Sequence, residues 1–125
     1  MPSSVRIGDK ERWVEVVHHG LVTIEELKDV RRTAAEMMVK ANLSRVLVDG
    51  RDADIAALAT MDTYEFNASH ASTLPFAGRL RIAVVVAPGH REKSGFGEDV
   101  ARNRGVNLRT FLDADNARRW LAEKS

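Results

Sequence analysis

Two short runs of apolar residues constrain the fold of this sequence more than any other feature. Val46-Leu47-Val48 and Ile82 to Val86 contain no polar side chain, which is typical of strands covered on both faces. Longer stretches between and around them place apolar residues three and four positions apart, the spacing of a helix face. Strands that alternate with helices form right-handed crossovers and a mainly parallel sheet. The sequence therefore predicts an α/β fold.

Capping residues and turn residues place the remaining elements. Thr23 and Glu26 form a capping box at the start of a helix, and Asn42 is suited to end it in a left-handed conformation. Thr60 is expected to cap a second helix and Asp113 the last one. A third helix is expected around Phe96, Val100 and Arg104. The expected strands are Val5 to Ile7, Trp13 to Val17, Arg45 to Asp49, Ile82 to Val86 and Asn107 to Phe111.

The predicted order of elements is β-β-α-β-α-β-α-β-α in a single domain that spans residues 1–125. The first two strands form a hairpin, which supplies one antiparallel edge strand to an otherwise parallel sheet. The free edge of Val5 to Ile7 could pair with a second copy of the chain across a two-fold axis, so a homodimer is possible.

Composition excludes several classes of function. The 19 Lys and Arg residues balance 18 Asp and Glu residues, so no overall positive field favours nucleic acid. The absence of cysteine excludes disulfides, thiolate zinc sites and cysteine nucleophiles. No apolar run approaches the ~20 residues of a membrane-spanning helix. With no recognisable signal peptide, we expect a cytoplasmic protein that is not integral to a membrane.

An acidic group follows the first apolar run. Ligands of open α/β sheets bind beyond the carboxyl ends of the parallel strands, where Asp49, Asp52 and Asp54 are expected in a loop from Gly50 to Ala59. Carboxylates suit Mg²⁺ or Ca²⁺, so a metal-dependent enzyme is one alternative. The spacing does not match an EF-hand, and Arg51 can pair with a carboxylate of the group. Structural roles in the loop are therefore favoured, and no metal site is expected.

A basic loop from Ala87 to Gly97 follows the second apolar run and leads into a helix whose free amides favour anions. Arg91, Lys93 and Ser94 are candidates for a weak anion contact. The Walker motif needs glycine directly before Lys-Ser, and the dinucleotide fingerprint fails at its third glycine. No cofactor is therefore expected.

No catalytic constellation is visible. The histidines lack metal-ligand spacing, and no Gly-x-Ser-x-Gly nucleophile elbow is present. Adjacent histidines on a strand point to opposite sides, so the first two cannot easily share an ion. The histidines, expected to be surface or packing residues, are His18, His19, His70 and His90.

Aromatic residues suggest an apolar ligand pocket between the helix that starts at Thr60 and the sheet. The rings considered are those of Tyr64, Phe66, Phe76 and Phe96. The inner face of that helix is expected to carry Met61, Tyr64, Ala68 and Ala71. The alternative is an ordinary core, because residues at helical spacing normally face the sheet.

Three segments in a fixed order resemble the SpoIIAA-like family. They are Val46-Leu47-Val48-Asp49-Gly50-Arg51-Asp52, Arg81-Ile82-Ala83-Val84-Val85, and a C-terminal stretch with Ala101-Arg102-Asn103-Arg104-Gly105, Arg109-Thr110-Phe111-Leu112-Asp113, Ala117 and Trp120-Leu121. Members are small bacterial STAS-fold proteins, related in shape to the lipid-binding CRAL-TRIO fold. The resemblance covers nearly the whole chain. It implies a non-enzymatic binding or regulatory module that acts on a partner protein or a small ligand.

In STAS anti-sigma-factor antagonists, a serine at the start of the helix after the central strand is phosphorylated, usually within an Asp-Ser pair. The corresponding segment here, Leu58-Ala59-Thr60-Met61-Asp62, has no such pair and offers only the hydroxyl of Thr60. A carrier of a small apolar, lipid-like ligand is the alternative function. The residues expected to bind a ligand or partner are Asp49, Asp52, Thr60, Tyr64, Arg91, Lys93, Ser94 and Phe96.

Overall fold

The computed structural model describes residues 3–8, 10, 12–76 and 78–123, and its centre is a five-stranded sheet with strand order β1-β2-β3-β4-β5. The strands are β1 (Ser3–Ile7), β2 (Val14–Leu21), β3 (Arg45–Asp54), β4 (Arg81–Val86) and β5 (Asn107–Phe111). Only the β1–β2 pair is antiparallel, and the other neighbouring pairs are parallel. The predicted α/β sheet with one antiparallel edge strand is confirmed. The homodimer stays a prediction.

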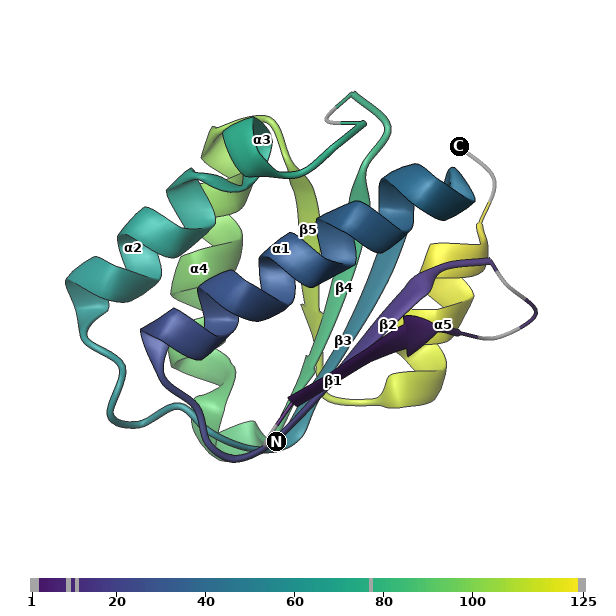
Figure 1. The fold of residues 1–125 in the computed structure, drawn as a ribbon. Coiled ribbons are helices and arrows are strands. Elements are labelled where there is room, and N and C mark those ends of the chain that lie inside the picture. The colour runs from purple at the N-terminus through teal and green to yellow at the C-terminus, as the bar shows by residue number, and fades with distance from the viewer. Residues whose placement is uncertain (1–2, 9, 11, 77, 124–125) are drawn as a thin grey trace.

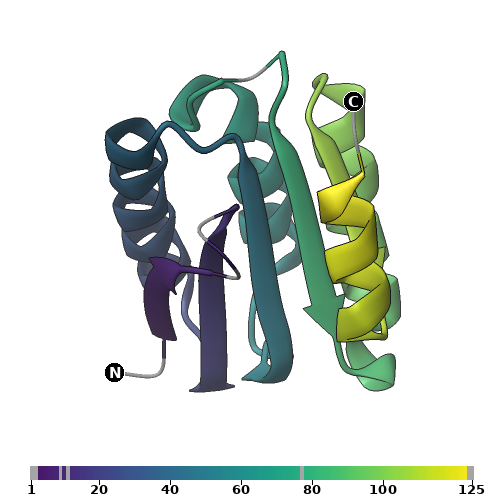
Figure 2. The same ribbon diagram turned by 90° about the vertical axis from the view of Figure 1, so that its right-hand side faces the viewer.

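Helices lie on both faces of the sheet in unequal numbers. They are α1 (Ile24–Ala41), α2 (Thr60–Ala68), the short α3 (His70–Thr73), the 3-10 turn η2 (Pro88–His90), α4 (Arg91–Asn103) and α5 (Ala114–Ala122). Figures 1 and 2 show α1, α2 and α4 on one face, and α5 alone on the other. No helix in the described part of the chain is long and apolar enough to span a bilayer.

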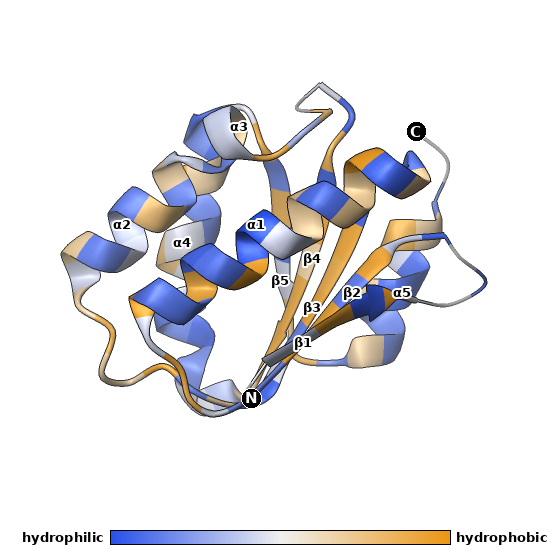
Figure 3. Ribbon diagram, viewed as in Figure 1, coloured by the Kyte–Doolittle hydropathy of each residue, from blue (hydrophilic) through white to orange (hydrophobic). Residues whose placement is uncertain are grey.

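The two faces of the sheet carry two separate cores, because side chains alternate along each strand. The core under α1, α2 and α4 includes Val14, Val16, Val46, Ile82, Leu108, Ala34 and Met38. The core under α5 includes Trp13, Leu47, Ala83, Val85, Ala117 and Leu121. Strand β4 after Arg81 and residues 46–48 of β3 are therefore apolar, whereas the second half of β3 carries charged residues, and the strands are coloured by hydropathy in Figure 3.

Three of the predicted helix ends agree with the structure. The Thr23 hydroxyl accepts the Glu26 N–H at 3.2 Å, and Asp113 accepts the Asp115 N–H at 2.8 Å. Asn42 ends α1 with a left-handed φ of 56°. The Glu26 side chain does not complete the capping box, because its carboxylate accepts the hydroxyl of Ser3 instead.

Two predicted loops are wrong in extent. The loop expected from Gly50 is strand as far as Asp54, because the long strand β2 continues beside it and pairs with residues 52–54. The loop expected as far as Gly97 is helical from Arg91 onward. Gly97 is needed there because α2 packs closely against α4: a Cβ on this glycine would lie 2.7 Å from the amide nitrogen of Asn67.

The predicted start of α2 is also wrong, and so is its predicted inner face at Met61 and Tyr64, whereas Ala71, which lies in α3, packs against the core as expected. Ala59 occupies the N-cap position without a side-chain hydrogen bond, and Thr60 is the first helical residue. The Met61 side chain is 64% exposed and the Tyr64 side chain 38% exposed. The side chains that face the sheet are those of Thr63, Phe66 and Asn67. The polar side chains of Thr63 and Asn67 therefore lie over a cavity. The spacing of apolar residues in the sequence does not predict this arrangement.

Candidate functional site

A cavity of about 180 Å³ lies between the sheet and helices α1, α2 and α4. Valines of the sheet form much of its surface, among them Val16, Val48 and Val84. The helices contribute further apolar groups, including Leu27, Val30, Ala34 and Phe66. Because most of the lining is hydrocarbon, the cavity suits an apolar molecule more than a strongly hydrated one.

Because of the cavity, two side chains in the middle of the sheet are incompletely buried. Val48 of β3 and Val84 of β4 are only half-buried, although both lie on the helix-covered face in the middle of the sheet. Their neighbours on the opposite face, Leu47 and Val85, are 1% and 0% exposed. Helices α1, α2 and α4 therefore cover this face without filling the space beneath them.

Arg31 brings a positive charge to the cavity wall. Its Nη1 donates to the Phe66 carbonyl at 2.8 Å, to Ser69 Oγ at 2.9 Å and to His70 Nδ1 at 3.2 Å. The guanidinium carbon lies 4.4 Å from the centre of the Phe66 ring, in cation–π geometry. Partial burial lowers the pKa of Arg31 from its usual value. These contacts fix the guanidinium between α1 and the end of α2.

His70 lies next to Arg31 and is deeply buried, with 5% of its surface exposed. Burial, with a smaller effect from the Arg31 charge, lowers the pKa of His70 to about 3. The imidazole is therefore neutral at physiological pH. Because Nδ1 accepts a hydrogen bond from Arg31, the ring hydrogen is on Nε2, which is left as a donor.

His18 lies on the β2 side of the same cavity and is 7% exposed. The Ser3 hydroxyl donates to Glu26 Oε2 at 2.8 Å and lies 2.6 Å from His18 Nδ1. Since that hydroxyl hydrogen is directed to the carboxylate, Nδ1 is the donor to Ser3 and Nε2 is an acceptor. Burial lowers the pKa of His18, Glu26 acts in the opposite direction, and His19 lowers it further. Neutral His18 thus presents a hydrogen-bond acceptor.

Two threonines that line the cavity have hydroxyl groups without a hydrogen-bond partner among the described residues. They are Thr63 of α2 and Thr110 of β5, and in both the Oγ1 atom is buried. A buried hydroxyl without a partner costs about 1–3 kcal/mol. The site therefore combines an apolar interior with polar groups able to orient a ligand.

Only two of the eight predicted binding residues line this cavity, namely Lys93 and Ser94. The Lys93 ammonium donates to the Leu58 carbonyl and so ties the start of α4 to the segment before α2. Thr60 and Arg91 are exposed and lie outside the cavity lining.

The other predicted aromatic residues do not gather into one pocket wall. Tyr64 and Phe96 are 38% and 39% exposed, and the Tyr64 hydroxyl accepts a hydrogen bond from Arg104 at 2.8 Å. Phe76 packs against the apolar core and does not line the cavity. Of the four rings considered, only that of Phe66 lines it.

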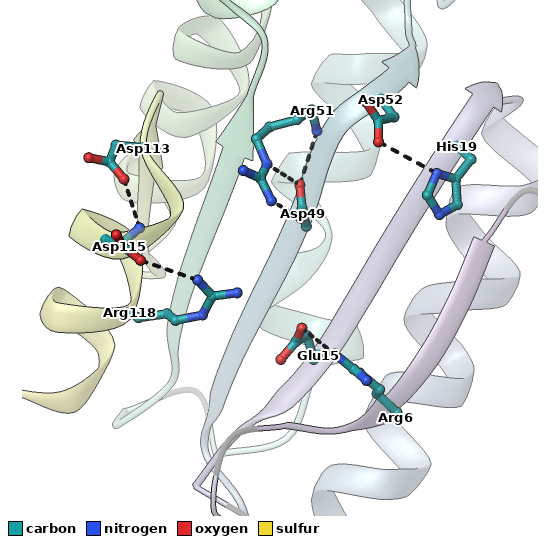
Figure 4. Close-up of polar contacts among 9 residues, drawn as sticks. All are labelled: Arg6, Glu15, His19, Asp49, Arg51, Asp52, Asp113, Asp115 and Arg118. Carbon is teal, nitrogen blue, oxygen red and sulfur yellow. Dashed lines mark hydrogen bonds and ion pairs between the residues drawn. The ribbon is translucent and has the colours of Figure 1, made fainter.

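The acidic group beside β3 does not converge on a common centre, as Figure 4 shows for Asp49 and Asp52. Asp49 accepts two hydrogen bonds from the Arg51 side chain, at 2.7 and 3.0 Å, and these hold the pKa of Asp49 below its usual range. Asp52 lies 3.8 Å from His19, and Asp54 accepts the Ala56 N–H. Within residues 3–8, 10, 12–76 and 78–123, no group of three His, Asp or Glu side chains could hold a metal ion.

Sequence reasoning missed the polar residues of the cavity, chiefly Arg31, Thr63, Asn67 and His70. One of the missed groups had a usable signal: His18 continues the alternation of Val14 and Val16 along β2, which places it on the same buried face. Arg31 had none, because an arginine on an amphipathic helix is normally a solvent-facing residue.

Comparisons with known proteins bear on the fold. No family model matches the chain, and no curated protein matches it. A crystal structure of an uncharacterized protein of the DUF3478 family, from Shewanella loihica PV-4, matches with a TM-score of 0.61 over 96% of this chain and 93% of that one. The two sequences are 16% identical, so the likeness concerns the fold, and that structure is described as SpoIIAA-like. This protein has a SpoIIAA-like fold, in agreement with the resemblance of its sequence to the SpoIIAA-like family.

Proposed function

We propose that this protein is a non-enzymatic binding module that holds a small apolar molecule in the cavity between the sheet and helices α1, α2 and α4. The observation that carries the proposal is the cavity itself, with about 180 Å³ of space and a lining that is mainly apolar. An apolar protein cavity of about 150 Å³ binds benzene. A single ring or a short chain is therefore the size of ligand that fits.

Apolar side chains that line an unfilled space lack packing partners on one side. A bound apolar molecule would restore the missing contacts with Val48, Val84 and their neighbours. The SpoIIAA-like fold is in keeping with a binding or regulatory module.

Native mass spectrometry, followed by denaturing mass spectrometry of the same sample, tests this proposal. We expect an extra mass that is lost on denaturation, or a rise in melting temperature when toluene is added. Val84→Phe fills the cavity and should abolish both effects. Val39→Phe is the matched control, because Val39 is 62% exposed on the outside of α1. A bare chain mass in the wild type, together with no response to toluene, would contradict the proposal.

Binding of a partner protein is a second candidate function. Met61 and Tyr64 of α2 and Phe96 of α4 are large apolar residues exposed to solvent on neighbouring helices. Exposed apolar groups of this kind are common where proteins associate. A ligand-free wild-type protein in the experiment above would favour this candidate over the first.

A further inference from the structure

The charged groups that line the cavity are all basic. Arg31 of α1 and Lys93 of α4 contribute cationic side chains, whereas no Asp or Glu of the described residues lines the space. Glu26 and Glu98 lie outside the lining, where Glu26 accepts the Ser3 hydroxyl and Glu98 accepts the backbone N–H of Thr110 at 2.5 Å. A molecule in this cavity therefore meets two basic side chains and no carboxylate in the lining.

Of the two cationic side chains, Arg31 gives the stronger indication of an anionic ligand. All three of its hydrogen bonds end on neutral acceptors, which are a backbone carbonyl, a hydroxyl and an imidazole nitrogen. No salt bridge of Arg31 is formed within the described part of the chain. A partly buried charge of this kind is costly unless an opposite charge is near. The three bonds also use only one terminal nitrogen, so other N–H groups of the guanidinium remain able to donate.

One further group of the cavity lining is free to donate. His70 directs its Nε2–H away from the guanidinium, because its Nδ1 faces Arg31. The Thr63 hydroxyl, one helical turn before Phe66 and Asn67, is buried without a partner among the described residues. A planar guanidinium and a free hydroxyl in the same lining suit a carboxylate, which accepts several hydrogen bonds at once.

We propose that the molecule held in the cavity is a small carboxylate, whose ring or short chain lies against the valines of β3 and β4 and whose carboxylate group binds the N–H groups of Arg31 that are left free. This inference rests on the proposed function, because it assigns the chemical class of the ligand for the same cavity. Lys93 has a lesser role, because its ammonium already donates to the carbonyl of Leu58. Leu58 precedes the first residue of α2, whereas Arg31 lies at the opposite end of that helix.

Isothermal titration calorimetry with two matched pairs of probes tests the assignment: benzoate against benzamide, and hexanoate against hexanamide. The members of each pair have nearly the same size and differ in charge. We expect the wild-type protein to bind each carboxylate at least tenfold more tightly than its amide, the lower end of what a charge-assisted hydrogen bond contributes. Equal binding of acid and amide would overturn this inference and leave the proposed function standing. If none of the four probes binds, this inference fails, and the proposed function fails with it only if toluene also leaves the melting temperature unchanged and the wild-type protein carries no extra mass.

Substitutions of the basic residues test whether the carboxylate group of the ligand binds Arg31. Arg31→Met should remove the preference for carboxylates and keep the binding of amides, whereas Arg31→Lys, which retains the charge, should keep part of the preference. Arg32→Met is the matched control, because Arg32 is exposed on α1 and pairs with Asp29. Lys93→Met should have a smaller effect than Arg31→Met. A loss of the preference in Lys93→Met, with Arg31→Met unchanged, would overturn the assignment to Arg31.

Discussion

The buried imidazole of His70 should make the stability of this protein steeply dependent on pH below neutrality. Its pKa is about 3 in the folded protein, against 6.5 for the unperturbed group. A base with a lowered folded-state pKa stabilises the fold fully above pH 6.5, where it is neutral in both states. That contribution is lost progressively as the pH falls from 6.5 toward 3, because the unfolded chain then binds a proton that the folded chain excludes.

The magnitude follows from the difference between the two pKa values. Each pH unit below 6.5 lowers the free energy of unfolding by about 1.4 kcal/mol until the folded-state pKa is reached. Between pH 7 and pH 5, His70 alone should therefore cost the protein about 2 kcal/mol. Burial of His18 acts in the same direction, so the wild-type protein should lose somewhat more than this in total.

Urea unfolding of wild type and His70→Asn at pH 7 and pH 5 isolates the contribution of His70. Asparagine keeps a polar acceptor for the Arg31 guanidinium and does not titrate in this range. The variant should lose about 2 kcal/mol less stability than the wild type between the two pH values. His19→Asn is the control for replacing an exposed imidazole, because the His19 side chain is 60% exposed, and it should not reproduce the effect of His70→Asn. The same loss in wild type and His70→Asn would refute the argument that burial keeps His70 neutral.

Two further substitutions test the structure at single groups. Thr110→Val replaces a buried hydroxyl that has no partner, so the free energy of unfolding measured in urea should stay the same or rise; a loss above about 1 kcal/mol would mean that the hydroxyl is hydrogen-bonded. Asp113→Ala removes the side chain that caps α5 and should lower the free energy of unfolding by about 1 kcal/mol. A stability equal to that of the wild type would show that this cap contributes nothing to α5.

The sequence predicted the order of the elements and a mainly parallel sheet with one antiparallel edge strand because strong local patterns indicate the elements. The runs Val46-Leu47-Val48 and Ile82 to Val86 are covered on both faces, which is typical of strands inside a parallel sheet. The helix ends at Asn42 and Asp113 follow from the conformational and hydrogen-bonding preferences of those side chains.

Element lengths were harder to predict because they depend on partners far away in the chain. Residues 51–54 read as a loop, yet they extend β3 because the end of β2 runs beside them and supplies the backbone hydrogen bonds. Helix α4 begins six residues before Gly97, although its glycines weaken the helical pattern. Gly97 lies where α2 packs against α4, and a Cβ there would come close to the side-chain amide of Asn67. Neither effect leaves a local trace in the sequence.

The candidate site was not predicted because α2 directs other side chains toward the sheet than the sequence pattern indicates. The spacing of apolar residues predicts Met61 and Tyr64 on the sheet side, but both are exposed, whereas Thr63, Phe66 and Asn67 line the cavity and the adjacent His70 is buried. Burying polar groups such as the Thr63 hydroxyl and the His70 ring while apolar side chains stay exposed is unfavourable for folding alone. Sequences depart from the rules of folding mainly at functional or strained sites. The polar groups that α2 and α3 bury are thus a second reason, beside the cavity volume, to look for the function of this protein beneath these helices.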